Sequence, residues 1–428
     1  MRRSQSSVPM GKEDYDSDLA FLDSESETEA PSTQAVGENQ LVVDKILGRK
    51  FIQNDQDGTD ELYFIKWKGM SYLHASWERR EDIEQVDEFK YLGMLMHGTK
   101  GLSPAIDLLC KAARRAMFGL QRRCQQLGIH DPVLKCKLFD TLVRPILCYC
   151  CEIWYVLGGK AALDDLERIE IGFLKVLLGV QVHTKTLHVL AEFGRYPLHV
   201  TWQLQAAHYL GRLEQMSHER ILKQAFNADC RLPEKVSWHA KLGELLHNFL
   251  DSAPHCDAQH HQTYSLHAAR DAHTAQLQSD VSSRATTYNS IKDGYNCEPY
   301  IRQCHNRHLR RILAQFRTGS HWLHIETGRH KKLDKNDRTC PICAHKCVNP
   351  GLPDQHFDSF DSDEEVADPV EDEHHVIFDC PEYTYVRKQF PDLFSSSVYS
   401  IGHFLNQPNC NRVAKFLTQV KAMRLNLA

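Results

Sequence analysis

Tyr63-Phe64-Ile65-Lys66-Trp67-Lys68-Gly69 is the stretch that decides the fold of the first part of this chain. Aromatic and β-branched residues favour a pleated backbone, so residues 61–68 are predicted to form a strand. The β-branched run at residues 41–46 predicts the strand before it. The polar stretch at residues 54–60, centred on an Asp-Gly pair, predicts the hairpin turn between the two strands.

Two more elements complete this first unit. Ala75-Ser76-Trp77 predicts a third short strand, and residues 80–86 predict a helix after it. The expected result is a small curved sheet capped by one helix. Such a unit holds roughly 50 residues, which is near the lower limit for folding alone. We place its boundaries at residues 40–88.

Downstream of Gly93 the hydrophobic period becomes that of a helix. Leu134, Leu138 and Leu142 share one face of one such helix. The predicted helix ends are N-cap residues before proline at Ser103-Pro104 and Asp131-Pro132, and a C-cap glycine at Gly179. Several amphipathic helices with short connections predict a helical bundle, so the fold class is multidomain α+β.

Composition indicates that most of the chain folds. Of 428 residues, 42% are hydrophobic and 25% are charged, which is ordinary for globular proteins. The formal net charge of −5 arises from two acidic stretches, residues 13–29 and 354–373, and the remainder is neutral to basic. Residues 1–39 lack bulky apolar periodicity and are predicted to be a disordered acidic tail. No apolar run reaches the ~20 residues that span a bilayer, so we expect no membrane partner.

Residues 40–88 resemble a chromodomain, a small histone-tail reader, of the type found in chromodomain helicases. The strings that carry the resemblance are Val43-Asp44-Lys45-Ile46-Leu47, the stretch from Tyr63 to His74, and Ser76-Trp77-Glu78. The resemblance implies a nuclear, chromatin-associated protein that binds a histone tail, with histone H3 as the expected partner.

This family traps a methylated lysine in an aromatic cage, because a quaternary ammonium is attracted to ring faces. Trp67, Met70 and Leu41 fall on the cage positions, and of these only Trp67 supplies a ring. The module is therefore predicted to be a methyl-lysine reader with a degenerate cage. The alternative is that Trp67 serves packing and that the groove binds unmodified or different peptides.

From residue 89 to about residue 395 the chain resembles the carboxyl-terminal part of a non-LTR retrotransposon reverse transcriptase. The strings are Phe89-Lys90-Tyr91-Leu92-Gly93, Leu142 to Leu147, Phe173 to Val180, and Glu192 to Leu198. The resemblance implies thumb-like helices over residues 89–215 that contact nucleic acid. The polymerase palm with its metal-binding carboxylates would lie upstream, and the ATP-binding loop of a helicase is missing. We therefore expect a protein that is not an enzyme.

A set of cysteines and histidines near the C-terminus has the spacing of a metal site. Cys340 and Cys343 form a C-x2-C pair, and His375 and Cys380 form an H-x4-C pair, which together predict a tetrahedral structural Zn²⁺ site. The same order resembles the zinc-binding end of these retroelement proteins. His374 and Cys347 are competing ligands, and buried thiols without metal are the alternative.

A basic helix precedes this set. Its arginines could neutralise phosphates of DNA or RNA, although a solvated helix face explains them equally well. They are Arg302, Arg307, Arg310, Arg311 and Arg317. The remaining segments are predicted as a poorly defined, mostly helical linker (216–299), the basic helix and zinc knuckle with an acidic loop (300–395), and a C-terminal helix (396–428).

Two functions are compatible with these patterns. The first is a chromatin-associated binding protein in which a chromodomain is fused to a non-catalytic, retrotransposon-derived nucleic-acid-binding region. The second is a non-functional or nucleic-acid-binding remnant of a retrotransposon in which the chromodomain is inert.

Overall fold

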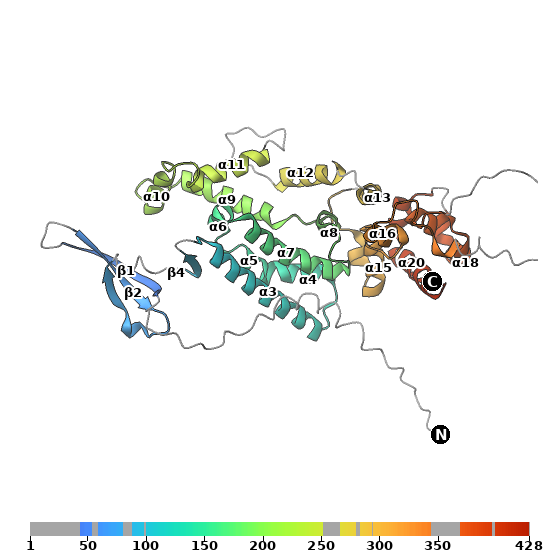
Figure 1. Cartoon of the computed structure of the whole chain (residues 1–428), viewed down its shortest axis with the longest axis horizontal. Helices are drawn as coiled ribbons and strands as arrows, with labels where there is room; N and C mark the ends of the chain where they lie inside the picture. The colour runs from blue at the N-terminus through green and yellow to red at the C-terminus, as the bar shows by residue number, and fades with distance from the viewer. Residues whose placement is uncertain are drawn as a thin grey trace, which may run out of the picture. The chain divides into compact units, whose positions relative to one another are not determined.

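The computed structural model describes residues 43–53, 59–79, 88–97, 100–250, 266–279, 283–292, 294–343, 369–395 and 399–427 (Figure 1). The chain divides into two compact units, Met1–Thr99 and Lys100–Ala428, each of which is described by itself. The predictions for residues 1–39, for Leu41, for the helix at 80–86 and for Cys347 lie outside the described residues.

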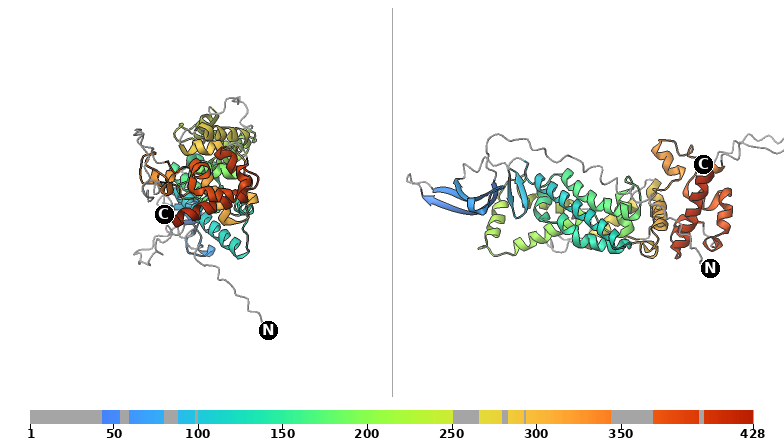
Figure 2. Two further views of the ribbon diagram at one scale, coloured as in Figure 1. Left: turned by 90° about the vertical axis from the view of Figure 1, so that its right-hand side faces the viewer. Right: turned by 90° about the horizontal axis from the view of Figure 1, so that it is seen from below.

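The first unit contains the predicted three-stranded antiparallel sheet. Its strands are β1 (Val43–Gln53), β2 (Thr59–Trp67) and β3 (Ser76–Arg79), in the order β1-β2-β3. β1 and β2 lie side by side along their length (Figure 2). A single 3-10 turn, Tyr72–His74, joins β2 to β3, and the Ser71 side chain caps it by accepting from the Leu73 amide. Ile65 is completely buried at the centre of the sheet.

A second hairpin follows, which the sequence did not predict. Its strands are β4 (Glu88–Tyr91) and β5 (Met94–His97), and β4 packs against β1. The turn consists of Leu92 and Gly93, with φ angles of 46° and 89°. Two successive positive φ angles suit the right-handed twist of a two-residue hairpin. Leucine rarely adopts a positive φ angle, so the Leu92-Gly93 sequence did not indicate a turn.

The second unit is mainly helical within its described residues, as predicted. Its first part contains α3 (Ser103–Gln126), α4 (Pro132–Leu142), α5 (Arg144–Leu147), α6 (Cys151–Leu157), α7 (Lys160–Leu178), α8 (Thr186–Phe193) and α9 (Leu198–Glu214). Then come α10 (Ile221–Asp229), α11 (Trp238–Leu250), α12 (Leu266–Ser279) and α13 (Ser283–Ile291). The last part contains α14 (Pro299–Gln303), α15 (Arg307–Arg317), α16 (His324–His330), α18 (Thr384–Lys388), α19 (Ile401–Leu405) and α20 (Cys410–Leu427).

Aromatic contacts between distant helices build the core of this unit. Phe139 of α4 stacks on Phe173 of α7 with 4.5 Å between ring centroids. Trp154 of α6 meets Trp202 of α9 edge to face at 5.1 Å. Both tryptophans are completely buried. None of the helices in the described ranges combines the length and apolar character that crossing a membrane requires.

Two of the predicted helix ends are confirmed and one is shifted. The Asp131 carboxylate accepts from the Val133 amide at 2.9 Å and so caps α4, and Gly179 ends α7 with φ of 69°. Ser103 is not an N-cap. It is the first residue of α3, and Leu102 precedes it without a side-chain cap.

The leucine face of α4 points outward. Leu134 and Leu142 are 41% and 53% exposed and Leu138 is half-buried, whereas the buried residues are Pro132, Cys136 and Phe139 of the helix and Val143 after it. The helix therefore packs through a different face from the one that carries its three leucines.

Candidate functional site

Trp67 ends β2 and is held in place by a chain of hydrogen bonds. Its indole Nε1–H donates to the Ser76 hydroxyl at 2.8 Å, and that hydroxyl donates to a carboxylate oxygen of Glu78 at 2.6 Å. The strand register places Val43 opposite Trp67. The residue as a whole is half-buried. Because the hydrogen bonds fix the indole, little rotamer freedom is left to lose on binding a ligand.

Met70 lies in the turn that follows Trp67. Its amide donates to the Trp67 carbonyl at 3.3 Å, and its side chain is 41% exposed. The structure therefore brings two of the three predicted cage residues to one turn, while Leu41 lies outside the described residues.

Tyr72 is a ring near this turn that the sequence reasoning did not single out. It is 57% exposed, and its hydroxyl accepts from the Lys45 ammonium at 3.4 Å. The Lys66 ammonium lies 5.2 Å from the centre of its ring. A cation of the chain itself thus already occupies one face of this ring.

Cys340, Cys343, His375 and Cys380 come together as predicted. One ligand atom from each lies within 4.8 Å of all the others. The Cys343 sulfur is 3.5 Å from His375 Nε2 and 3.3 Å from the Cys380 sulfur. Three of the four residues are buried and Cys343 is half-buried. Among the described residues, this is the one such group, and its soft sulfur and imidazole donors could hold a metal ion.

Two thiols of this group, those of Cys340 and Cys343, have raised pKa values when no metal is bound. The hydrogen bond between its thiol and Cys380, together with burial, raises the pKa of Cys340 to about 12. Burial raises the pKa of Cys343 to about 11. A metal ion must therefore displace these protons in order to bind.

His374 is not part of the group. Its side chain is exposed, and its Nδ1 lies 2.8 Å from the Asp379 carboxylate. His374 is therefore directed away from the group. The other competing ligand, Cys347, lies outside the described residues.

The acidic triplet before His375 positions the metal group. The Glu371 carboxylate is completely buried and accepts from Arg424 at 2.6 and 2.9 Å and from the His324 amide at 2.6 Å. Asp372 accepts from the His375 amide at 2.8 Å, and Glu373 pairs with His321 Nε2 at 2.8 Å.

The arginines of the predicted basic helix divide into two sets. Arg302, Arg307 and Arg311 are exposed, whereas Arg310 and Arg317 are 4% and 2% exposed. Arg310 donates to the Cys304 carbonyl at 2.8 Å. The two buried arginines contact groups inside the protein. Phosphate contact therefore stays a prediction for Arg302, Arg307 and Arg311.

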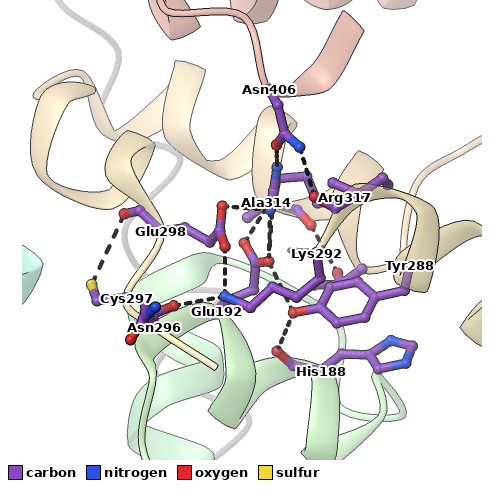
Figure 3. A network of polar contacts seen from close by, with 12 residues as sticks. His188, Glu192, Tyr288, Lys292, Asn296, Cys297, Glu298, Ala314, Arg317 and Asn406 are labelled. Carbon is purple, nitrogen blue, oxygen red and sulfur yellow. Dashed lines mark hydrogen bonds and ion pairs between the residues drawn. The ribbon is translucent and has the colours of Figure 1, made fainter. Parts of the chain in front are cut away.

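Arg317 lies at the centre of a buried polar network (Figure 3). It contacts the Glu192 carboxylate at 3.1 Å and the Glu298 carboxylate at 2.6 Å, and it donates to the Asn406 side chain at 2.7 Å. Lys292 donates to Glu298 at 2.5 Å. Two acids and two bases therefore balance one another away from water.

Burial opposes the charged form of Glu192, but Arg317 and Lys292 outweigh it and lower the pKa of this carboxyl. The Tyr288 hydroxyl adds a hydrogen bond to the same carboxylate at 3.0 Å. A buried network that is fully paired is stable, whereas the loss of one member leaves a charge without a partner.

Comparison with known proteins assigns the first unit only. Residues 41–91 match the family model of the Chromo (CHRromatin Organisation MOdifier) domain. No curated protein and no solved structure matches the chain. The resemblances to the chromodomain-helicase type and to a retrotransposon reverse transcriptase therefore stay predictions. Residues 41–91 match a chromodomain, which at a coarse level suggests binding to chromatin or to a histone tail.

Proposed function

We propose that this protein is a nuclear chromatin-binding protein whose chromodomain holds a histone H3 tail with a lysine against Trp67. One observation carries the proposal. Within the segment that matches the family, the Trp67 indole is fixed by Ser76 and Glu78, the residue is half-buried, and the exposed Met70 lies in the turn that follows it.

We expect weak discrimination between methylated and unmethylated lysine. Each cation–π contact contributes ~0.5 to 2 kcal/mol, and two cage positions lack rings. The affinity for a trimethylated peptide should therefore be one to two powers of ten below that of a complete cage.

Isothermal titration of the full chain with H3 tail peptides, with and without lysine methylation, tests this proposal. Trp67→Ala should abolish the heat of binding. Trp77→Phe is the matched control, because Trp77 pairs with Phe64 on the other face of the sheet. The absence of heat with any tail peptide, or equal binding by the Trp67→Ala variant, would refute the proposal.

A second activity, nucleic-acid binding by the helical unit, is supported by Arg302, Arg307 and Arg311, which are exposed on α14 and α15. We propose that this retrotransposon-derived region binds DNA or RNA without catalysis. Its affinity should fall linearly with salt on a logarithmic scale. The double variant Arg307→Gln/Arg311→Gln should lower the slope by about 2, whereas Arg168→Gln on α7 should leave it unchanged.

We further propose that the Cys340, Cys343, His375 and Cys380 group holds a structural Zn²⁺. Three thiolates and one imidazole are a closed tetrahedral donor set, which leaves no open position for catalysis. The bound ion would fix the segment that carries His375 against the segment that carries Cys340.

A further inference from the structure

One face of the β1-β2-β3 sheet collects positive charge. The register pairs Lys45 with Lys66, and Lys50 with Leu62, which in turn pairs with Arg79, so these four basic residues share one face. We call this set of Lys45, Lys50, Lys66 and Arg79, together with Phe64 and Trp77, the basic face. Trp67 lies on the opposite face, because side chains alternate along β2.

Exposed rings accompany the basic side chains. The Lys50 ammonium lies 4.3 Å from the centre of the Trp77 ring, and Trp77 packs on Phe64 at 5.1 Å. Trp77 remains 40% exposed. Lys45 and Lys66 lie directly opposite each other across the two strands, which brings two of the basic residues together at one end of the face. An anionic ligand with apolar groups would match the sign of these side chains and cover the rings.

The chain carries a segment of that chemistry upstream of β1. Residues 13–29 contain four large apolar or aromatic residues, Tyr15, Leu19, Phe21 and Leu22. Their acidic residues are Glu13, Asp14, Asp16, Asp18, Asp23, Glu25, Glu27 and Glu29. Residues 30–42 connect this segment to β1 and can extend over roughly 45 Å. The nine residues of β2 cover about 30 Å, so the segment can reach every part of the basic face.

We propose that residues 13–29 dock on the basic face of the sheet. A short tether gives the segment an effective concentration on the order of millimolar at the basic face. A free polyanion must exceed this concentration to compete for the same face. The docked segment would cover Trp77 and neutralise the lysines. The Trp67 side of the sheet would stay open, so docking is independent of the proposed histone-tail function.

Indole N–H signals in the NMR spectrum of the full chain test the proposal. The variant has all eight acidic residues of 13–29 replaced by Asn or Gln. The signal of Trp77, assigned by its loss in Trp77→Phe, should shift, while the signals of the other five tryptophans stay in place. Roughly 0.5 M salt should move the wild-type signal to the same position, because the Debye length is then only about 4 Å.

The second acidic stretch supplies a matched control. Replacing Asp354, Asp358, Asp361, Asp363, Glu364, Glu365 and Asp368 by Asn or Gln removes seven negative charges, close to the eight of the test variant, and should leave the Trp77 signal unchanged. If the signal fails to move when residues 13–29 are neutralised, or moves equally in the control, docking is refuted.

Chymotrypsin gives an independent readout, because Tyr15 and Phe21 are cleavage sites within the segment. Lys45→Gln/Lys50→Gln should speed cleavage at these sites several-fold, whereas Lys111→Gln/Arg115→Gln on α3 should not. Adding a short DNA duplex tests nucleic acid as the alternative ligand of the basic face. If DNA shifts the Trp77 signal of the wild-type chain while neutralising residues 13–29 does not, the basic face binds nucleic acid and the proposal is wrong.

Discussion

Arg424 of α20 donates two hydrogen bonds, 2.6 and 2.9 Å long, to the carboxylate of Glu371, which is completely buried. Glu371 lies four residues before the metal-group member His375. The backbone amide of Ile325 also donates to the Glu371 carbonyl, at 3.1 Å. The pair therefore links the metal group to the last helix and to α16.

Removing Arg424 should destabilise this end of the protein strongly. Arg424→Ala leaves the Glu371 carboxylate buried without its cation, which costs about 3–5 kcal/mol. Denaturant unfolding of the purified chain measures the change. Arg412→Ala is the matched control, because the Arg412 pair with Asp392 is exposed, and it should change the free energy of unfolding little. Equal effects of the two variants would contradict the positioning role of Glu371.

Chelation should unfold the segment around the metal group. Structural zinc contributes ~10–16 kcal/mol in isolated fingers, so Cys343→Ser should lose both the bound zinc and protease resistance near residues 369–395. Atomic absorption should find one zinc per chain in the wild type. His374→Ala and Cys347→Ser should keep their zinc. Loss of zinc in either of them would show that the ligand set differs from the one we propose.

Metal affinity should fall as the pH falls. The pKa of the Cys343 thiol is raised by burial to about 11, so binding releases a proton from it at neutral pH. Competition with a chelator between pH 6 and 8 measures the slope. An affinity that does not change with pH would mean that no thiol of the group loses a proton on binding, which would contradict thiolate ligation.

Acid should weaken the helical unit through Glu192. Its folded-state pKa lies below the unfolded value of about 4.3, so its contribution to stability is present above that value and is lost as the pH falls through the folded pKa. Burial raises the pKa of Glu298, whose contribution has the opposite sign. Glu192→Gln should therefore flatten the acid limb of the stability profile, whereas Glu219→Gln, at an exposed position, should not.

Restoring a ring at Met70 should strengthen methyl-lysine binding. Met70→Phe adds one cation–π contact of ~0.5–2 kcal/mol, which raises the affinity for a trimethylated peptide roughly 2- to 30-fold. The unmethylated peptide should bind both chains equally in the same titration. An equal gain for both peptides would indicate added hydrophobic contact rather than a cage.

The sequence predicted the features that depend on neighbouring residues. The Asp131 cap lies two residues from the amide that it accepts from, and β2 follows from the aromatic and β-branched run that ends at Trp67. The metal group was found because its cysteine and histidine donors have few other uses at that spacing. These signals do not require knowledge of what packs against them.

The features that depend on distant partners were missed. The leucines of α4 indicated one apolar face, but Phe139 packs on Phe173 of α7 and turns that face outward. Arg317 belongs to a basic run, yet its partner Glu192 lies 125 residues away. No pattern within a single helix distinguishes an arginine that meets solvent from one that meets a buried carboxylate.

The network around Arg317 also determines where the chain can be cut without separating charged partners. It draws on residues near 190, 290, 317 and 406, so its members are distributed over half of the polypeptide. A splice variant or proteolytic fragment that stops after α13 would retain Glu192 without its arginine. We expect such a product to be degraded, so the region downstream of residue 100 would persist in the cell only as a whole.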